Sequence, residues 1–179
     1  PTVFIGQPFP RMRYPYVDVD NEGASYHAAK LLIERGRRNI AIIAGPNDMV
    51  TPKQRTIGCS DGLADHGIEP LTVIPGDYTA EHGFEACEKI LEQYPEVDGI
   101  FAQSDQIAMG VLQALARHGR RVPDDVSVIG FDDFSIAMTT DPKLTTFAQP
   151  LRDMAQAIAE MLCWRLKHGE WNAMAQVLP

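Results

Sequence analysis

The sequence predicts an α/β fold in which a parallel β-sheet is covered by helices on both faces. Short apolar runs alternate with amphipathic segments of helical length along almost all of the 179 residues. The helical segments carry start and stop signals, such as the pair Thr51-Pro52 at one start and Gly67 after the same helix. A strand, a helix and a further parallel strand connect by right-handed crossovers, which place helices on both sides of one sheet.

Three short runs predict buried central strands, because they are rich in β-branched residues, apolar on both faces and bounded by turn residues. These strands are Asn39–Ala44, Gly99–Ala102 and Val126–Phe131, and weaker candidates are Leu71–Ile74 and Leu144–Phe147. The segment Gln7–Pro15 is proline-rich and irregular, which predicts a long loop or a passage between domains.

Five segments carry apolar residues at steps of three and four, which is typical of a helix with one buried face. The predicted helices are Ala24–Arg35, Pro52–His66, Glu81–Tyr94, Asp105–His118 and Leu151–His168. Thr51 is the expected N-cap of the second helix, and a glycine follows four of the five.

The composition excludes several classes of protein. There are 16 lysines and arginines against 24 aspartates and glutamates, and the net charge of −8 argues against a broad basic face that grips phosphates. No apolar run approaches the ~20 residues that span a membrane. The three cysteines lack a C-x-x-C pair, so we expect small buried residues of a reducing compartment and no disulfide framework. The chain opens with Pro1 and no initiator methionine, as the interior of a longer protein would.

Polar residues follow the predicted strands, where ligands of open parallel sheets bind. They include Tyr78, Ser104, Asp105 and Asp132, with Arg55 just inside a helix. Carboxylates accept hydroxyl donors, an arginine donates a fork of N–H groups, and an aromatic ring covers the apolar face of a sugar. The set predicts a cleft for a polyhydroxylated small molecule. The alternatives are a helix start at Ser104-Asp105 and a solvated turn at Asp132-Asp133.

Motifs of catalysis carry little weight in this chain. Gly58-Cys59-Ser60-Asp61-Gly62 fits G-x-S-x-G, with Asp132 and His168 following in triad order, but Ser60 would lie inside a helix rather than on a strand-to-helix turn. An Mg²⁺ pair at Asp132-Asp133 lacks a convergent lysine or a phosphate-binding loop. Neither G-x-G-x-x-G nor G-x-x-x-x-G-K-[ST] occurs, and the histidines show no metal-ligand spacing. No catalytic residue, cofactor or metal is predicted.

Five stretches resemble the lactose/galactose-repressor (LacI/GalR) family of bacterial transcription regulators, in its order and at its spacing. They are PTVFIG at 1–6, DNEGASYHAAKLLIERGRRNIAIIAGP at 20–46, QRTIGCSDGL at 54–63, SDQIAMGVLQALARHGRRVPDDVSVIGFDD at 104–133 and PKLTTFAQP at 142–150. The combination VPDDVSVIGFDD–PKLTT is highly specific.

The resemblance implies a periplasmic-binding-protein-like effector domain with two lobes, one of them incomplete here. Residues 1–19 and 148–179 would be parts of the N-terminal lobe, and residues 20–147 would form the C-terminal lobe. The helix-turn-helix DNA-binding domain of the family is absent from this sequence, as is its closing strand after Pro179.

The implied function is that of a cytoplasmic, non-enzymatic repressor, in which a small effector between the lobes, a sugar by this resemblance, alters operator binding. The effector-binding residues implied by position are Arg55, Asp132, Ser104, Asp105, Tyr78 and Thr51. Arg55 would clamp the effector and Tyr78 would stack on a sugar ring. Many members carry aspartate where this chain has Gly6, so we expect a carboxylate contact from the N-terminal lobe to be lost.

Members of the family form homodimers, and by position Met109, Ile136 and Met138 are candidates for an apolar patch in that contact. Met109 is alternatively a core residue beside Ala108. The alternative function is a periplasmic sugar-binding protein of a transport system, whose precursor would begin with a secretory signal. An enzyme of the same architecture is a weaker third hypothesis.

Overall fold

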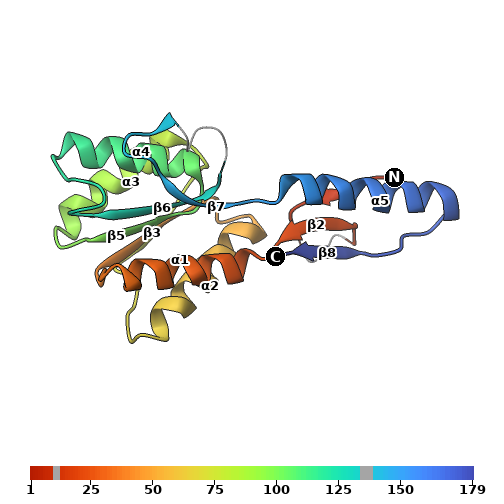
Figure 1. Cartoon of the computed structure of the whole chain (residues 1–179), viewed down its shortest axis with the longest axis horizontal. Helices are drawn as coiled ribbons and strands as arrows, with labels where there is room; N and C mark the ends of the chain where they lie inside the picture. Colours follow the sequence, from red (N-terminus) through yellow and green to blue (C-terminus); the bar gives the residue numbers. More distant parts are fainter. Residues whose placement is uncertain (10–12, 134–138) are drawn as a thin grey trace.

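The computed structural model describes residues 1–9, 13–133 and 139–179, which form two parallel sheets (Figure 1). The smaller sheet has the order β1-β2-β8 and consists of β1 (Phe4–Ile5), β2 (Tyr16–Val19) and β8 (Ala175–Leu178). The larger sheet has the order β4-β3-β5-β6-β7 and consists of β3 (Ile40–Ala44), β4 (Val73–Pro75), β5 (Gly99–Ala102), β6 (Ser127–Asp132) and β7 (Thr145–Ala148). All strand pairs are parallel.

Four helices cover the two faces of the five-stranded sheet (Figure 1). They are α1 (Asn21–Glu34) and α2 (Val50–Ala64) on one face, and α3 (Ala80–Gln93) and α4 (Asp105–Arg117) on the other. The inner strand β3 shows why both faces are apolar: Ile40 and Ile42 pack toward α1 and α2, whereas Ala41 and Ile43 pack toward α3 and α4. The predicted fold class is confirmed.

The fifth helix, α5 (Leu151–His168), packs on the three-stranded sheet through Met154, Ala157 and Met161. It ends at Gly169, whose φ of 77° supplies the left-handed conformation of a C-cap. The chain passes from the small sheet into α1 at Asp20 and from the large sheet into α5 at Gln149-Pro150 (Figure 1). The division into lobes at residues 19–20 and 147–148 stays a prediction.

The start of α2 differs from the prediction. Thr51 is not the N-cap, because the helix begins at Val50 and its N-cap, Met49, makes no side-chain hydrogen bond. Pro52 fits two residues further in, since an amide N–H in the first turn has no partner within the helix and its loss costs little. Ser60 lies within α2, as expected.

Two further expectations need correction. Cys59 and Cys87 are buried, but Cys163 is exposed on α5, so the expectation of burial is wrong for that thiol. The strands of the three-stranded sheet are not among the predicted elements. β1 has only two residues, and Asp18 in β2 and Gln176 in β8 interrupt the continuous apolar run by which the four-residue strand Gly99–Ala102 is predicted. Within the described ranges, none of the helices has the length and apolarity that crossing a membrane requires.

Candidate functional site

A cavity of about 310 Å³ lies where the carboxyl ends of strands from both sheets meet. Ile5, Gly6 and Asp18 line it from the three-stranded sheet. From the five-stranded sheet and its helices come Met49, Thr51, Arg55, Tyr78, Ser104, Gln106 and Asp132, and Gln149 and Met154 follow β7. Polar groups that are far apart in sequence therefore surround one hollow, at the edge of a parallel sheet where ligands bind.

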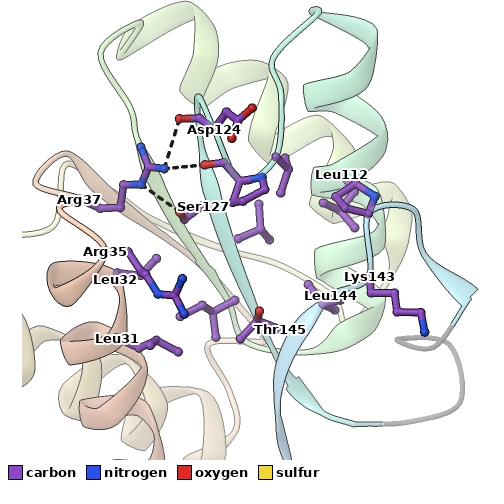
Figure 2. A pocket seen from close by; sticks show the side chains of 15 residues that line it. Leu31, Leu32, Arg35, Arg37, Leu112, Asp124, Ser127, Lys143, Leu144 and Thr145 are labelled. Carbon is purple, nitrogen blue, oxygen red and sulfur yellow. Dashed lines mark hydrogen bonds between the residues drawn. The ribbon is translucent and has the colours of Figure 1, made fainter.

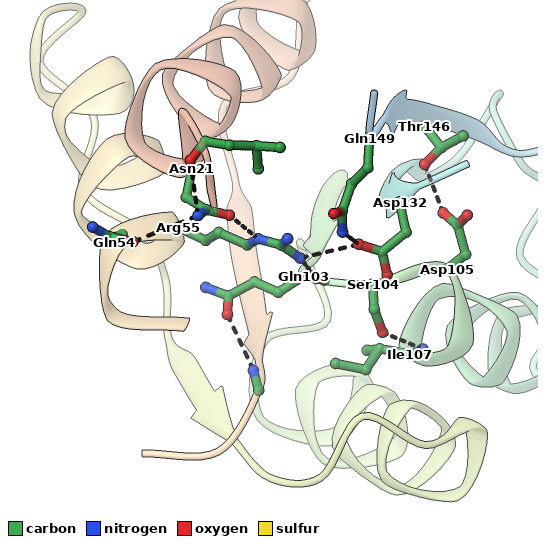
Figure 3. A network of polar contacts seen from close by, with 12 residues as sticks. Asn21, Gln54, Arg55, Gln103, Ser104, Asp105, Ile107, Asp132, Thr146 and Gln149 are labelled. Atoms are coloured by element: carbon green, nitrogen blue, oxygen red, sulfur yellow. Dashed lines mark hydrogen bonds and ion pairs between the residues drawn. The ribbon is translucent and has the colours of Figure 1, made fainter. Parts of the chain in front are cut away.

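Arg55 lies at the centre of a buried polar network (Figure 3). Its residue is only 3% exposed, because α2 directs the side chain under the ends of β5 and β6. The Nε atom donates to Oδ1 of Asn21 at 2.9 Å, and Nη1 donates to the backbone oxygen of Gln103 at 2.5 Å. The guanidinium carbon lies 3.5 Å from the ring centre of Phe131, a cation–π contact. Burial lowers the pKa of Arg55, although the nearby Asp132 opposes that shift.

Asp132 faces Arg55 from the last position of β6. Its Oδ1 atom lies 3.5 Å from Nη1 of Arg55 and accepts a hydrogen bond of 2.6 Å from Nε2 of Gln149. Burial raises the pKa of Asp132 above its ordinary value, while Arg55 and Gln149 act in the opposite direction. The backbone φ of Asp132 is 111°, in a region that residues with a side chain rarely occupy. Such strain is concentrated at functional sites.

Tyr78 and Ser104 follow the ends of β4 and β5, the two strands that flank β3. The Tyr78 ring lies so close to Gly45 that a Cβ atom there would stand 2.4 Å from Cζ of the ring. Its hydroxyl oxygen is buried and finds no hydrogen-bond partner among the described residues. Burial raises the pKa of Tyr78, and the positive charge of Arg55 counteracts that effect. Ser104 is the N-cap of α4, with Oγ accepting from the backbone N–H of Ile107 at 3.2 Å.

The structure separates Asp105 from the other five predicted residues. Its residue is 1% exposed, and its Oδ1 atom accepts a hydrogen bond of 2.6 Å from Oγ1 of Thr146 in β7 (Figure 3). Asp105 is not part of the cavity lining, whereas Thr51 is part of it from the first turn of α2. The structure thus brings together Arg55, Asp132, Ser104, Tyr78 and Thr51.

Asp18 and Gln149 line the cavity but were not predicted as site residues. Asp18 is 5% exposed, and Oδ1 accepts from the backbone N–H of Val19 and from Nδ2 of Asn21. Asp18 therefore brings a residue with a carboxylate to the cavity from the three-stranded sheet, while Gly6, which also lines the cavity, has no side chain to offer a ligand. A signal for Asp18 was its place in the run YVDV, where a single charge interrupts apolar residues.

A second cavity, of about 450 Å³, lies at the opposite, amino ends of β6 and β7 (Figure 2). Its walls include Leu31, Leu32 and Leu144, and one of its two arginines, Arg37, donates to the Ser127 hydroxyl and to two backbone oxygens. Arg37 is thus engaged in holding the loop before β6, whereas Arg35 and Lys143, which also line this cavity, are exposed. Unlike the first cavity, it lies away from the carboxyl ends of the strands, where ligands of open parallel sheets bind.

Met109 is half-buried on α4 and lines a surface hollow with Leu112 and Ala116. Ile136 and Met138, the other two predicted interface residues, lie outside the described residues. The described part of the chain contains no cluster of three or more histidines, cysteines or carboxylates that could hold a metal ion.

Comparisons of sequence relate this chain to known proteins. A family described as a periplasmic binding protein-like domain matches residues 29–179. The HTH-type transcriptional regulator CelR of Thermobifida fusca is 39% identical over 170 residues, which are 93% of this chain and 50% of the relative. The HTH-type transcriptional repressor CytR of Escherichia coli is 36% identical over 152 residues, 84% of this chain and 45% of the relative. The chain thus spans about half the length of these relatives.

Solved structures agree with the sequence relatives. A complex of the transcriptional regulator CelR with cellobiose has a TM-score of 0.92 and 38% identity, over 98% of this chain and 55% of that one. A lac repressor dimer bound to operator and the anti-inducer ONPF has a TM-score of 0.90 and 27% identity, over 100% of this chain and 62% of that one. The chain belongs to the periplasmic-binding-protein-like domain family, in the form that LacI-type transcriptional regulators carry.

Proposed function

We propose that this chain is the effector-binding and dimerisation portion of a LacI-type transcriptional repressor. A small polyhydroxylated effector, a sugar, occupies the cavity between the two sheets. Its binding shifts the arrangement of the lobes, residues 1–19 with 148–179 against residues 20–147, and a helix-turn-helix outside this chain transmits the change to operator DNA. The protein acts as a cytoplasmic homodimer.

The observation that carries this proposal is the pairing of buried Arg55 with Asp132 inside a cavity that both sheets line. Two opposite charges, a buried tyrosine hydroxyl and the Ser104 hydroxyl offer the donors and acceptors that a sugar requires. A ligand that touches both sheets binds one lobe arrangement better than another, which is the condition for coupling to a distant site. Arg55, Asp132, Ser104, Tyr78 and Thr51 are the proposed contacts, and Asp105 is omitted because its carboxylate faces Thr146.

The relatives support a regulator over a transport protein, since CelR and CytR are both named as transcriptional regulators. The CelR structure contains cellobiose, which makes cellobiose the first sugar to test here.

The first experiment is a thermal-shift screen of the intact protein against cellobiose, other sugars, sugar phosphates and nucleobases. A ligand at 100 times its dissociation constant adds about 2.7 kcal/mol of stability.

Arg55→Ala is then compared with wild type by calorimetry, and we expect it to lose about 2–5 kcal/mol of binding free energy. Arg37→Ala is the matched control, because Arg37 is half-buried and hydrogen-bonded but lies outside this cavity. Unchanged binding by Arg55→Ala contradicts the site assignment.

A further inference from the structure

Gln149 lies where the chain crosses between the two sheets, and it donates two hydrogen bonds to Asp132. It follows β7 directly and precedes Pro150 and α5. Its backbone N–H donates to the backbone oxygen of Asp132 at 3.2 Å, and its side-chain Nε2 donates to Oδ1 of Asp132 at 2.6 Å. Both the backbone and the side chain of the crossing residue are therefore fixed to the end of β6 (Figure 3).

The side-chain bond uses the acceptor that faces the cavity. Oδ1 of Asp132 is the atom that lies 3.5 Å from Arg55, and both Asp132 and Gln149 line the hollow. A carboxylate oxygen accepts a strong hydrogen bond from a neutral donor, and a length of 2.6 Å is short for an N–H···O bond. A hydroxyl group of a bound ligand competes with the Gln149 carboxamide for this oxygen.

The other crossing joins the same network. Nε of Arg55 donates to Oδ1 of Asn21, the first residue of α1, and Nδ2 of Asn21 donates to Oδ1 of Asp18 in β2. Arg55 therefore connects the two crossings. It bonds to Asn21 beside the crossing at Asp20, and it pairs with Asp132, to which Gln149 of the other crossing is bonded. Asp132 is therefore linked to both connections between the sheets, directly to Gln149 and through Arg55 to Asn21.

We propose that Gln149 is an internal competitor of the effector: its carboxamide occupies Oδ1 of Asp132 in the empty protein, and an effector hydroxyl displaces it and thereby releases the crossing at residues 148–150. This proposal, here called the Gln149 latch, rests on the proposed function for the nature of the displacing group. The effector class that it requires carries a hydrogen-bond donor directed at Asp132.

The latch is tested without a ligand by measuring the distance between the two sheets. In the intact protein, the exposed residues Lys89 of α3 and Lys167 of α5 are each replaced by a cysteine that carries a spin label. The exposed Cys163 is replaced by serine. Cys59 and Cys87 stay, because burial raises the pKa of each thiol to about 12 and keeps them unreactive toward the label.

We expect Gln149→Leu to broaden the label-to-label distance distribution relative to wild type. Gln149→Glu broadens it further, because a second carboxylate at this position repels Asp132. Gln149→Asn, whose shorter side chain cannot keep the 2.6 Å bond without moving the crossing, covers the case in which Gln149→Leu fails to fold. Gln156→Leu is the matched control, since Gln156 donates to Glu160 on the exposed side of α5 and its loss leaves the distribution unchanged. Wild-type distributions in all three Gln149 variants overturn the latch.

A second measurement uses cellobiose as the probe. If Gln149 competes for Asp132, Gln149→Leu binds cellobiose about 10-fold more tightly, the value of one hydrogen bond to a charged group. Weaker binding by this variant makes Gln149 a ligand contact and overturns its role as a competitor. If neither protein binds cellobiose, the sugar proposal fails for this sugar, while the distance measurement still decides the latch.

Discussion

At the scale of single residues, burial affects the charges of Arg55 and Asp132 more than their mutual attraction does. The closest approach of the two charged groups is 3.5 Å, longer than the 2.7–2.9 Å of a typical charge-assisted hydrogen bond. Burial is the first cause of both pKa shifts, upward for Asp132 and downward for Arg55, so each group is displaced toward its neutral form. The pair is held ready for a further partner, since a donor reaching Asp132 recovers part of the lost hydration.

The raised pKa of Asp132 makes the stability of the protein depend on pH, and Asp132→Asn removes this dependence. A carboxyl group whose pKa is higher in the folded than in the unfolded protein favours folding in its protonated form. The free energy of unfolding of wild type minus that of Asp132→Asn is therefore highest below the ordinary pKa of 3.8 and falls as the pH rises through the folded pKa. Denaturant unfolding of both proteins in steps between about pH 3 and pH 7 measures the difference.

Other carboxyl groups cancel in this difference, because both proteins contain them. The Asp132→Asn variant also keeps an acceptor for Gln149, because the carboxamide oxygen of an asparagine accepts a hydrogen bond as a carboxylate oxygen does. A difference that rises with pH over the same range contradicts the prediction and means that Arg55 holds the pKa of Asp132 below 3.8.

At the scale of elements, most helices and central strands could be predicted from local pattern. Gly99–Ala102 and Leu151–His168 have the predicted bounds, because turn residues and a final glycine mark their ends. The start of α1 lies earlier than Ala24, since Asp20 caps it by accepting from the backbone N–H of Gly23. β2 and β8 could not be found this way, because these short segments become strands through pairing with other segments, β2 with both β1 and β8.

The start of α4 tests whether Ser104 is a cap, a ligand contact or both. Its hydroxyl oxygen accepts from Ile107 N–H, and the hydroxyl proton remains available to a ligand in the cavity. We expect Ser104→Ala to lose about 1 kcal/mol of unfolding free energy and also affinity for the sugar identified in the screen, while Ser104→Thr keeps both. Thermal unfolding and calorimetry measure the two effects.

The matched control for this prediction is Thr79→Ala. Thr79 caps α3 in the same way, by accepting from the backbone N–H of His82 at 3.2 Å, but it does not line the cavity. It should lose stability and keep affinity. If Ser104→Ala behaves like Thr79→Ala, capping is the whole role of Ser104.

At the scale of the whole molecule, the candidate site could be predicted only for its larger part. The α/β pattern predicts parallel strands, whose carboxyl ends lie at one edge of the sheet, so the gathering of Arg55, Tyr78, Ser104 and Asp132 there could be expected. The contribution of Asp18 depends on how a second sheet meets the first, and local pattern carries no information on that. Asp105 shows the converse limit, because it directly follows the cavity-lining Ser104 in sequence but bonds to Thr146 and does not line the cavity.

The proposed homodimer is a prediction about the whole molecule. Met109, half-buried on α4, shares a surface hollow with Leu112 and Ala116, and a twofold axis brings such a patch against its own copy. We expect Met109→Glu to weaken the dimer of the intact protein roughly 100-fold, or about 3 kcal/mol, because it buries two like charges in the contact. Sedimentation equilibrium over a range of concentrations measures this change.

Ile57→Glu is the control, since Ile57 is an apolar residue 49% exposed on α2 and outside the hollow. A dimer of wild-type strength in Met109→Glu shows that α4 is not in the contact, and a wild-type protein that stays monomeric contradicts the dimer itself.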